Sequence, residues 1–236
     1  MSRILVIADS HINPVGAFPV LWRCLGEYCV KTKPDYVVHL GDVADLDSQA
    51  WLKASRGVYE LDQEIDVVRC HLGAFHNAIK QHNENCRQMH RAMYNPKLVL
   101  CLGNHDVRNG STAIADLFTE FGWEVHDYLD MVQIDNVTFT HCARKGLSDT
   151  MCVTAQELLE NWHGNIIVGH GHHKDFAEGY SLATGEAITA LRCPVFNKNE
   201  PAWAAQTNKK WSRGFTEITT NPFRFIWRDL SCLCED

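Results

Sequence analysis

The stretch KLVLCLGNHD, residues 97–106, is a short apolar run that meets Gly103 and three polar residues at its end. A short run without polar alternation is typical of a strand buried on both faces. Ile4–Ala8 and residues 35–40 have the same character, and a helical pattern at 18–31 lies between those two. Alternating strands and helices predict an α/β fold.

The second half of the chain is richer in expected strands. Asp135-Asn136 is a tight-turn pair between the apolar runs 131–134 and 137–141, so a hairpin is predicted there. Thr154 and Glu157 form a capping box for a helix through Trp162, which Gly164 ends. Further strands are expected at 165–168, 215–219 and 223–227. No repeat or linker interrupts the pattern, which predicts a single domain over residues 1–236 with a helical insertion at about 45–95.

The strongest periodic signal is the 3-4 spacing of apolar residues between Val58 and Met93. A helix over 58–93 would be about 54 Å long, whereas a compact domain of this length is about 45 Å across. Such a helix must overhang, bend near Gly73 or meet another subunit. We favour a helix, or a helix pair broken at Gly73, packed on the core. The alternative is that 58–93 forms a homo-oligomer contact or a lid beside the functional site.

Composition excludes several classes of protein. The 236 residues are 45% hydrophobic and 22% charged, which excludes a disordered chain or a coiled-coil rod. No apolar stretch approaches the roughly 20 residues of a membrane span, and the run Ile4–Ala8 is too short for a secretory signal. Ten scattered cysteines without a CxxC pair predict reduced thiols and a cytoplasmic protein. The net charge of −7 argues against a broadly basic nucleic-acid-binding surface but is compatible with a local basic patch.

Five expected strands end in residues that bind metals. The endings are Asp9-Ser10-His11, Gly41-Asp42, Gly103-Asn104-His105-Asp106, His141 and Gly169-His170-Gly171-His172. Any one of them alone is a plausible turn, cap or structural histidine. Ligands collect beyond the carboxyl ends of strands in an open α/β sheet, so the five endings together predict one site.

This ordered set of motifs resembles the calcineurin-like metallophosphoesterases, a superfamily of two-metal hydrolases. The resemblance covers Asp9 to His172 and implies a metallophosphoesterase-type β-sandwich flanked by helices (α/β/β/α) with a long helical insertion. Two positions depart from the usual pattern, since Cys142 follows His141 where glycine is usual and Gly171 stands where threonine or serine is common. Both departures concern backbone shape and remove no ligand.

The resemblance implies a ligand set for two divalent ions. One ion would be held by Asp9, His11 and His172, the other by Asn104, His141 and His170, with Asp42 between them. Carboxylate, imidazole and amide ligands suit borderline divalent ions, and we expect Mn²⁺, with Fe, Zn, Ni or Co as alternatives.

The family pattern also implies roles for residues beside the metals. His105 would contact the substrate phosphate, as Asn104 would, and protonate the leaving oxygen as a general acid. Asp106 would orient a histidine. Arg108 and Arg144, with Lys145 next to it, are candidates for holding substrate phosphate, although each is equally well explained as solvated surface charge.

The expected function is hydrolysis of a phosphate ester by a water or hydroxide that bridges two metal ions. The resemblance favours a phosphodiester of nucleotide or nucleic-acid type, because the chain shows no second recognition domain and small phosphodiesterases of this superfamily are similar to it in that plan. The alternatives are a phosphomonoesterase, acting on a small molecule or a protein, and a metal-binding scaffold without catalysis. A protein phosphatase fits less well, since the chain is short for that branch.

Overall fold

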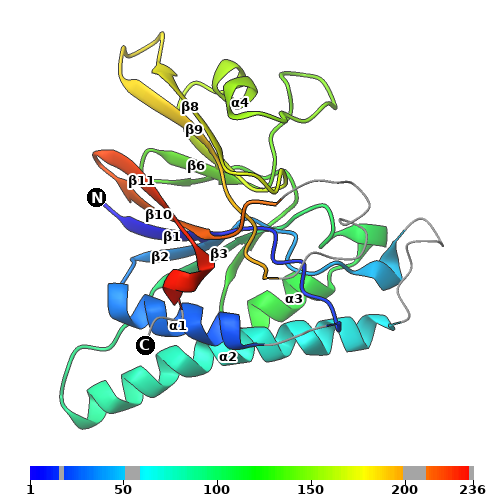
Figure 1. Ribbon diagram of the computed structural model, residues 1–236, viewed down its shortest axis with the longest axis vertical. Coiled ribbons are helices and arrows are strands. Elements are labelled where there is room, and N and C mark those ends of the chain that lie inside the picture. Colours follow the sequence, from blue (N-terminus) through cyan, green and yellow to red (C-terminus); the bar gives the residue numbers. More distant parts are fainter. Residues whose placement is uncertain (16–18, 51–58, 199–210, 234–236) are drawn as a thin grey trace.

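The computed structural model describes residues 1–15, 19–50, 59–198 and 211–233. Two β-sheets lie face to face in it, with α1, α2 and α3 below the first sheet and α4 beside the second (Figure 1). The α/β/β/α order expected from the sequence is therefore confirmed. The helices are α1 (Val20–Thr32), α2 (Leu61–Gln88), α3 (Ala113–Glu120) and α4 (Ala155–Asn161).

The first sheet has the order β11-β10-β1-β2-β3-β4. Its strands are β1 (Arg3–Ile7), β2 (Tyr36–His39), β3 (Lys97–Cys101), β4 (Glu124–His126), β10 (Phe215–Thr220) and β11 (Phe223–Arg228). The four strands from β1 to β4 are parallel, while β10 and β11 join antiparallel at one edge. The loops that follow β1, β2 and β3 consequently leave the sheet at the same end.

The second sheet has the order β5-β6-β7-β9-β8. Its strands are β5 (Val132–Ile134), β6 (Val137–Thr140), β7 (Asn165–Val168), β8 (Asp175–Tyr180) and β9 (Ala187–Arg192). The parallel strands β6, β7 and β9 form its centre. Hairpin β5–β6 and the capping box of Thr154 and Glu157 on α4 were both predicted from the sequence and are confirmed.

β1 shows why a wholly apolar strand suits this position. Leu5 and Ile7 pack into the core between the first sheet and its helices, whereas Ile4 and Val6 pack between the two sheets. Both faces of the strand are thus removed from water. Apolar side chains buried on each face stabilise the fold.

The long helix takes one of the two expected forms. α2 runs without interruption through Gly73, so the expected single helix is confirmed and the alternative of a helix pair broken at that residue is wrong. Its 28 residues correspond to about 42 Å, close to the expected diameter of the domain. Val58 lies outside the described residues, and Met93 follows the helix without belonging to it.

α2 packs on the core of its own chain. Val68, Leu72 and Phe75 are fully buried, and α1 lies along them. Gly26 of α1 allows this approach, because a Cβ atom there would lie 2.6 Å from the Phe75 carbonyl oxygen. The apolar stripe that suggested self-association is therefore covered over these residues by α1.

α2 also supports the functional end of the molecule. Near its start, the Glu64 carboxylate accepts hydrogen bonds from the amides of Asp47 and Ser48, at 2.7 and 3.3 Å. These residues lie in the loop after β2. Within the described ranges, the structure has no helix that is both long and apolar enough to cross a membrane.

Candidate metal centre

The strand-end residues expected to act together lie together in the structure. Loops after β1, β2, β3, β6 and β7 bring them to the edge where the two sheets meet. Three groups of metal-binding side chains form there: Asp9, His11, Asp42 and His172; Asp42, His141 and His170; and His11, Asp45 and His105. Asp42 belongs to the first two groups.

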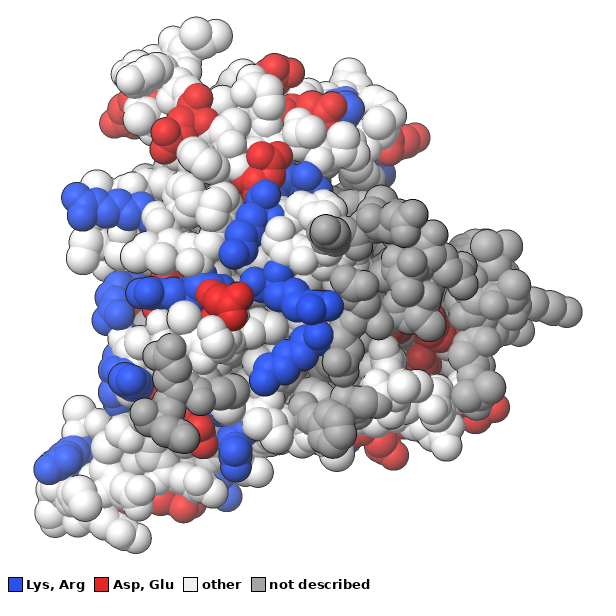
Figure 2. Space-filling view, in the orientation of Figure 1, with Lys and Arg blue, Asp and Glu red and all other residues white. Residues whose placement is uncertain are grey.

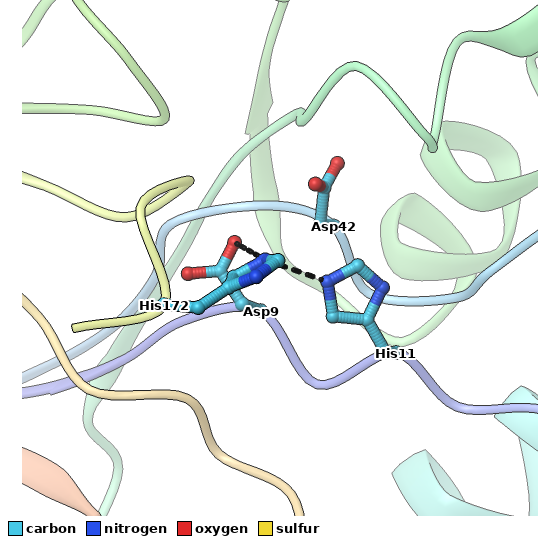
Figure 3. A group of neighbouring side chains, drawn as sticks. All are labelled: Asp9, His11, Asp42 and His172. Carbon is cyan, nitrogen blue, oxygen red and sulfur yellow. Dashed lines mark hydrogen bonds and ion pairs between the residues drawn. The ribbon is translucent and has the colours of Figure 1, made fainter. Parts of the chain in front are cut away.

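The first group is compact and almost entirely buried (Figure 3). His172 points between Asp9 and His11, with its Nε2 3.1 Å from Nε2 of His11 and 3.8 Å from Oδ1 of Asp9. The indole of Trp211 lies against both imidazoles, with ring centroids 4.4 Å from His172 and 5.5 Å from His11. Trp211 thus forms an apolar wall on one side of this group.

In the second group, ligand atoms converge on Nε2 of His141. That atom lies 3.1 Å from Oδ1 of Asn104, 3.2 Å from Nδ1 of His170 and 3.4 Å from Oδ2 of Asp42. Nδ1 of His141 donates to the carbonyl oxygen of Leu40 at 2.6 Å, so in the neutral ring Nε2 carries a lone pair. Two acceptors, Nε2 and the Asn104 oxygen, then face each other.

These residues fit a metal ion. Oδ2 of Asp9 is buried and has no hydrogen-bond partner in the described part of the chain. Burial, together with the nearby carboxylate of Asp42, raises the pKa of Asp9 to about 7. A buried carboxylate oxygen without a donor is costly unless a cation binds it. A cation would likewise satisfy the two lone pairs that face each other on Nε2 of His141 and Oδ1 of Asn104. The mixture of carboxylate, imidazole and amide groups suits a borderline divalent ion.

Asp45 orients His11 and was not anticipated from the sequence. Its Oδ1 lies 2.9 Å from Nδ1 of His11, and its Oδ2 accepts a hydrogen bond from Asn13. Burial disfavours a charged imidazole, but the bond and the charge of Asp45 outweigh burial and raise the pKa of His11 to about 9. A carboxylate behind a histidine leaves the other ring nitrogen turned toward the metal and makes it more basic.

His39 is hydrogen-bonded to the loops that follow β1 and β2. Its Nδ1 accepts a hydrogen bond from the amide of Gly41, and its Nε2 lies 2.7 Å from Oγ of Ser10. Burial lowers the pKa of His39 to about 3, so the ring is neutral and able to accept at Nδ1. The residues that flank Asp9 and Asp42 are therefore tied to one buried side chain.

Several of the candidate ligands have left-handed backbone conformations. These are Asp9, His11, Asp42, His170 and His172, with φ between 42° and 62°. Such conformations are unfavourable for residues other than glycine, and they persist only where the surroundings enforce them. Close packing of two loops enforces one of them, since a Cβ atom on Gly103 would lie 2.2 Å from the Asp42 amide nitrogen.

His105 and Arg108 lie beside the ligands. Nε2 of His105 accepts a hydrogen bond from Nη2 of Arg108 at 2.9 Å, and Nδ1 lies 3.1 Å from the carbonyl oxygen of Asp45. Burial lowers the pKa of His105 to about 4, so its ring is neutral near pH 7. Arg108 also donates to the Asp45 carbonyl oxygen, and its guanidinium lies 3.7 Å from Asp47.

Asp106 contacts the backbone of two site loops. Its carboxylate accepts hydrogen bonds from the backbone amides of Val43 and Gly103, at 2.9 and 2.8 Å, and its expected role in orienting a histidine stays a prediction. Asp106 therefore holds the loops after β2 and β3 together, which places Asp42 and His105 indirectly. The sequence could not distinguish these roles, because both require a buried carboxylate next to the ligands.

Arg144 and Lys145 are placed less centrally. Arg144 is half exposed and lies 3.3 Å from Asp149, and Lys145 lies 2.7 Å from Glu157, which forms the capping box of α4 with Thr154. The ion pair of Lys145 is structural. Arg144 remains at the rim, in the loop that follows His141.

Comparisons with known proteins identify the family of this chain. The family model described as calcineurin-like phosphoesterase matches residues 2–209. A curated relative, the Gene 54 protein of Mycobacterium phage L5, is 23% identical over 93% of this chain and 89% of its own length. A solved structure, the nuclease MPE of Pseudomonas putida, is 13% identical, with a TM-score of 0.42 over 95% of this chain and 87% of that one. On the match to the family model, this chain belongs to the calcineurin-like phosphoesterase family.

Proposed function

We propose that this protein hydrolyses a phosphodiester with two divalent metal ions bound at the strand-end site. The observation that supports two ions is the sharing of Asp42 between two groups of ligands. Asp9, His11 and His172 would hold one ion, and Asn104, His141 and His170 the other. Bound there, two ions would neutralise a phosphate and lower the pKa of a water between them.

The residues of the chain prepare this chemistry in three ways. Asp45 would keep Nε2 of His11 free to hold one ion, and the carbonyl oxygen of Leu40 would do the same for Nε2 of His141 and the other ion. Trp211 excludes water from one side of the first group. Asp42, with Oδ1 held by the His105 amide at 2.8 Å, turns Oδ2 toward His141.

His105 would act at the leaving group. Its Nε2 is held at 2.9 Å from Arg108, so an incoming phosphate would meet the guanidinium and the imidazole together. An anion beside the ring favours the protonated form, which raises the pKa of His105 from its low value and enables proton transfer to the leaving oxygen. Arg108 would bind a phosphate oxygen, and Asn104 would contact the same group.

The charges around the site support a diester over a monoester. Three arginines near the site each have a carboxylate within 4.0 Å: Asp47 for Arg108, Asp149 for Arg144 and Asp175 for Arg192. A diester carries one negative charge, whereas the dianion of a monoester requires more unpaired positive charge from the protein. These three paired arginines thus favour the less charged substrate.

A polyanionic diester such as a nucleic acid is supported by one surface. Despite the net charge of −7, Lys and Arg side chains form a band across the middle of one face, at the level of β1, β10 and β11 (Figure 2). Arg3 and Arg224 contribute to this part of the first sheet, since both are cross-strand partners of Thr219. Basic side chains of this kind attract phosphate backbones.

The cellular setting and the metal are also proposals. Every described cysteine is a free thiol, and most are buried, which supports a reducing compartment such as the cytoplasm. Mn²⁺ is the proposed ion because the ligands combine hard and borderline donors, with Fe, Zn, Ni and Co as alternatives.

The test is a paired assay of metal-loaded protein with a bis-aryl phosphodiester and the matching aryl phosphomonoester. We expect hydrolysis of the diester, abolished by a chelator and restored by Mn²⁺. Preferential hydrolysis of the monoester would support a phosphomonoesterase, and metal binding without hydrolysis of either would support a scaffold. A scaffold is disfavoured by the chain itself, which retains His105 and a side chain at every ligand position.

A further inference from the structure

Gly171, which separates His170 from His172, has its side-chain space occupied by another residue. A Cβ atom built on Gly171 would lie 1.3 Å from Nη2 of Arg192. Gly171 is not among the residues with positive φ, so its backbone conformation does not require glycine. The requirement for glycine is therefore steric, and it comes from the guanidinium of Arg192.

Arg192 is the last residue of β9, and its side chain connects three segments. The strand register pairs it with Val168, directly before the ligand loop 169–172, and with Asp175 at the start of β8. Its Nη1 donates to the carbonyl oxygen of Val153 at 2.5 Å and lies 4.0 Å from Oδ2 of Asp175. The same Asp175 oxygen accepts a hydrogen bond from the amide of Ala155, the first residue of α4.

The guanidinium is largely removed from water. Arg192 is only 9% exposed, and burial lowers its pKa. A buried arginine with one ion pair and one carbonyl contact costs desolvation energy that an exposed arginine avoids. The position of the Arg192 guanidinium against the ligand loop therefore indicates that it does more than form an ion pair with Asp175.

The ligand loop needs such support. His170 and His172 have φ values of 62° and 57°, both in the left-handed region. Within the loop, the amide of Gly171 donates to the carbonyl oxygen of Gly169, and the amide of His170 donates to Oδ1 of Asp9. These bonds fix one side of the loop, and Arg192 occupies the space on the side of Gly171 into which the chain would otherwise relax.

We propose that Arg192 is a positioning residue that holds His170 and His172 in place at once, so that a single guanidinium sets the geometry of both halves of the metal centre. Gly171 is the matching partner, because any side chain there would displace the guanidinium. The proposal rests on the proposed two-metal site but does not depend on which phosphate ester is hydrolysed.

The experiment uses the full chain and measures Mn²⁺ affinity, together with the electron paramagnetic resonance signal that reports spin coupling between two Mn²⁺ ions. The variants are Arg192→Ala, Arg192→Lys, Gly171→Ser and the double variant Gly171→Ser with Arg192→Ala. Arg69→Ala is the control, since Arg69 forms an ion pair with Glu120 between α2 and α3, away from the loop. Circular dichroism checks that each variant is folded.

We expect Arg192→Ala to weaken Mn²⁺ binding by about 10- to 100-fold and to reduce the spin coupling, as is usual when a partner of metal ligands is removed. Arg192→Lys keeps the charge but lacks the planar fork, so it should restore only part of the affinity. Gly171→Ser should weaken binding more than Arg192→Ala. In the double variant, Gly171→Ser should cause no further loss of Mn²⁺ affinity, because the guanidinium that the serine would displace is absent.

Three results would overturn the proposal: wild-type Mn²⁺ affinity and coupling in Arg192→Ala, additive losses in the double variant, or an equal loss in Arg69→Ala. If Gly171→Ser does not fold, the comparison of Arg192→Ala with Arg192→Lys still decides. Failure of the proposed function looks different. Wild-type protein would then bind two coupled ions, lose them on Arg192→Ala and yet hydrolyse no phosphate ester.

Discussion

Oδ1 of Asp45 lies 2.9 Å from Nδ1 of His11, with both side chains buried, so a carboxylate stands directly behind one of the imidazoles that we propose to bind metal. Replacing it by asparagine keeps the shape and removes the charge. We expect Asp45→Asn to weaken divalent metal binding about 10- to 100-fold without unfolding the protein. Isothermal titration with Mn²⁺ measures this loss, and Asp116→Asn, on the outside of α3, is the matched control. Unchanged affinity in Asp45→Asn would show that His11 needs no such partner.

His105 should separate catalysis from metal binding. In His105→Ala, we expect kcat to fall by about 10²- to 10⁴-fold for a diester with a poor leaving group, since no acid remains to protonate the departing oxygen. The loss should be much smaller with nitrophenolate, which leaves without a proton. Metal analysis of the same preparation should still find about two ions per chain. A collapse of metal content would instead make His105 a ligand.

Two glycines of the helical layer should respond in opposite directions to alanine. At Gly26 a Cβ atom would lie 2.6 Å from the Phe75 carbonyl oxygen and 2.8 Å from Cβ of Ala78, whereas at Gly73 it would meet nothing within 4 Å. Gly26→Ala should therefore lower the free energy of unfolding by about 1–3 kcal/mol. Gly73→Ala should raise it by about 0.5–1 kcal/mol. Urea denaturation measures both, and a destabilising Gly73→Ala would contradict the uninterrupted helix.

Stability should fall in mild acid through His76, which lies in α2 and is not one of the candidate metal ligands. Burial lowers the pKa of His76 to about 4, and its Nε2 accepts a hydrogen bond from Nε1 of Trp123 at 3.1 Å. Between about pH 6.5 and pH 4 the unfolded state binds a proton at His76 that the folded state does not. The free energy of unfolding should thus decrease as pH falls, by at most about 1.4 kcal/mol per pH unit from this group.

The variant His76→Gln keeps a hydrogen-bond acceptor for Trp123 and removes the titration. Wild type should lose stability faster than His76→Gln between pH 6.5 and pH 4, and the two should run parallel above pH 7. If the free energy of unfolding had the same pH dependence in both proteins over the whole range, His76 would not be the cause of the loss of stability in acid.

The strand-end motifs predicted more of the fold than the rest of the sequence did. Each apolar run before a motif became a strand, because a continuous apolar stretch of that length fits a position covered on both faces, as Leu5 and Ile4 show in β1. By contrast, β8 and the helix α3 were not predicted. β8 is an edge strand, and Phe176 and Tyr180 are exposed on it. Its side chains alternate between half-buried and exposed, so it lacks the continuous apolar run that marked the buried strands.

The periodicity between Val58 and Met93 predicted the helix but not its course. Gly73 suggested a turn because glycine is unfavourable within helices, yet packing of Leu72 and Phe75 beside α1 outweighs that local preference. Oligomerisation through this segment stays a prediction.

In the candidate site, the motifs predicted which residues are the candidate ligands, but not the residues that orient them. Asp45 follows Asp42 by only three residues, and that spacing was an available signal. Arg192 carried no such signal in the sequence, where it stands outside every motif. It lies next to Gly171 because β9 pairs with β7 and brings Arg192 opposite Val168. Contacts between distant segments of this kind depend on the folded sheet.

The number of Mn²⁺ ions bound per chain tests the central claim, that Asp42 joins two metal sites. Equilibrium dialysis followed by metal analysis should give about two ions for wild type, and at most one, weakly held, for Asp42→Ala, which should also lose turnover. A single ion in wild type, or two ions with full activity in Asp42→Ala, would contradict the account.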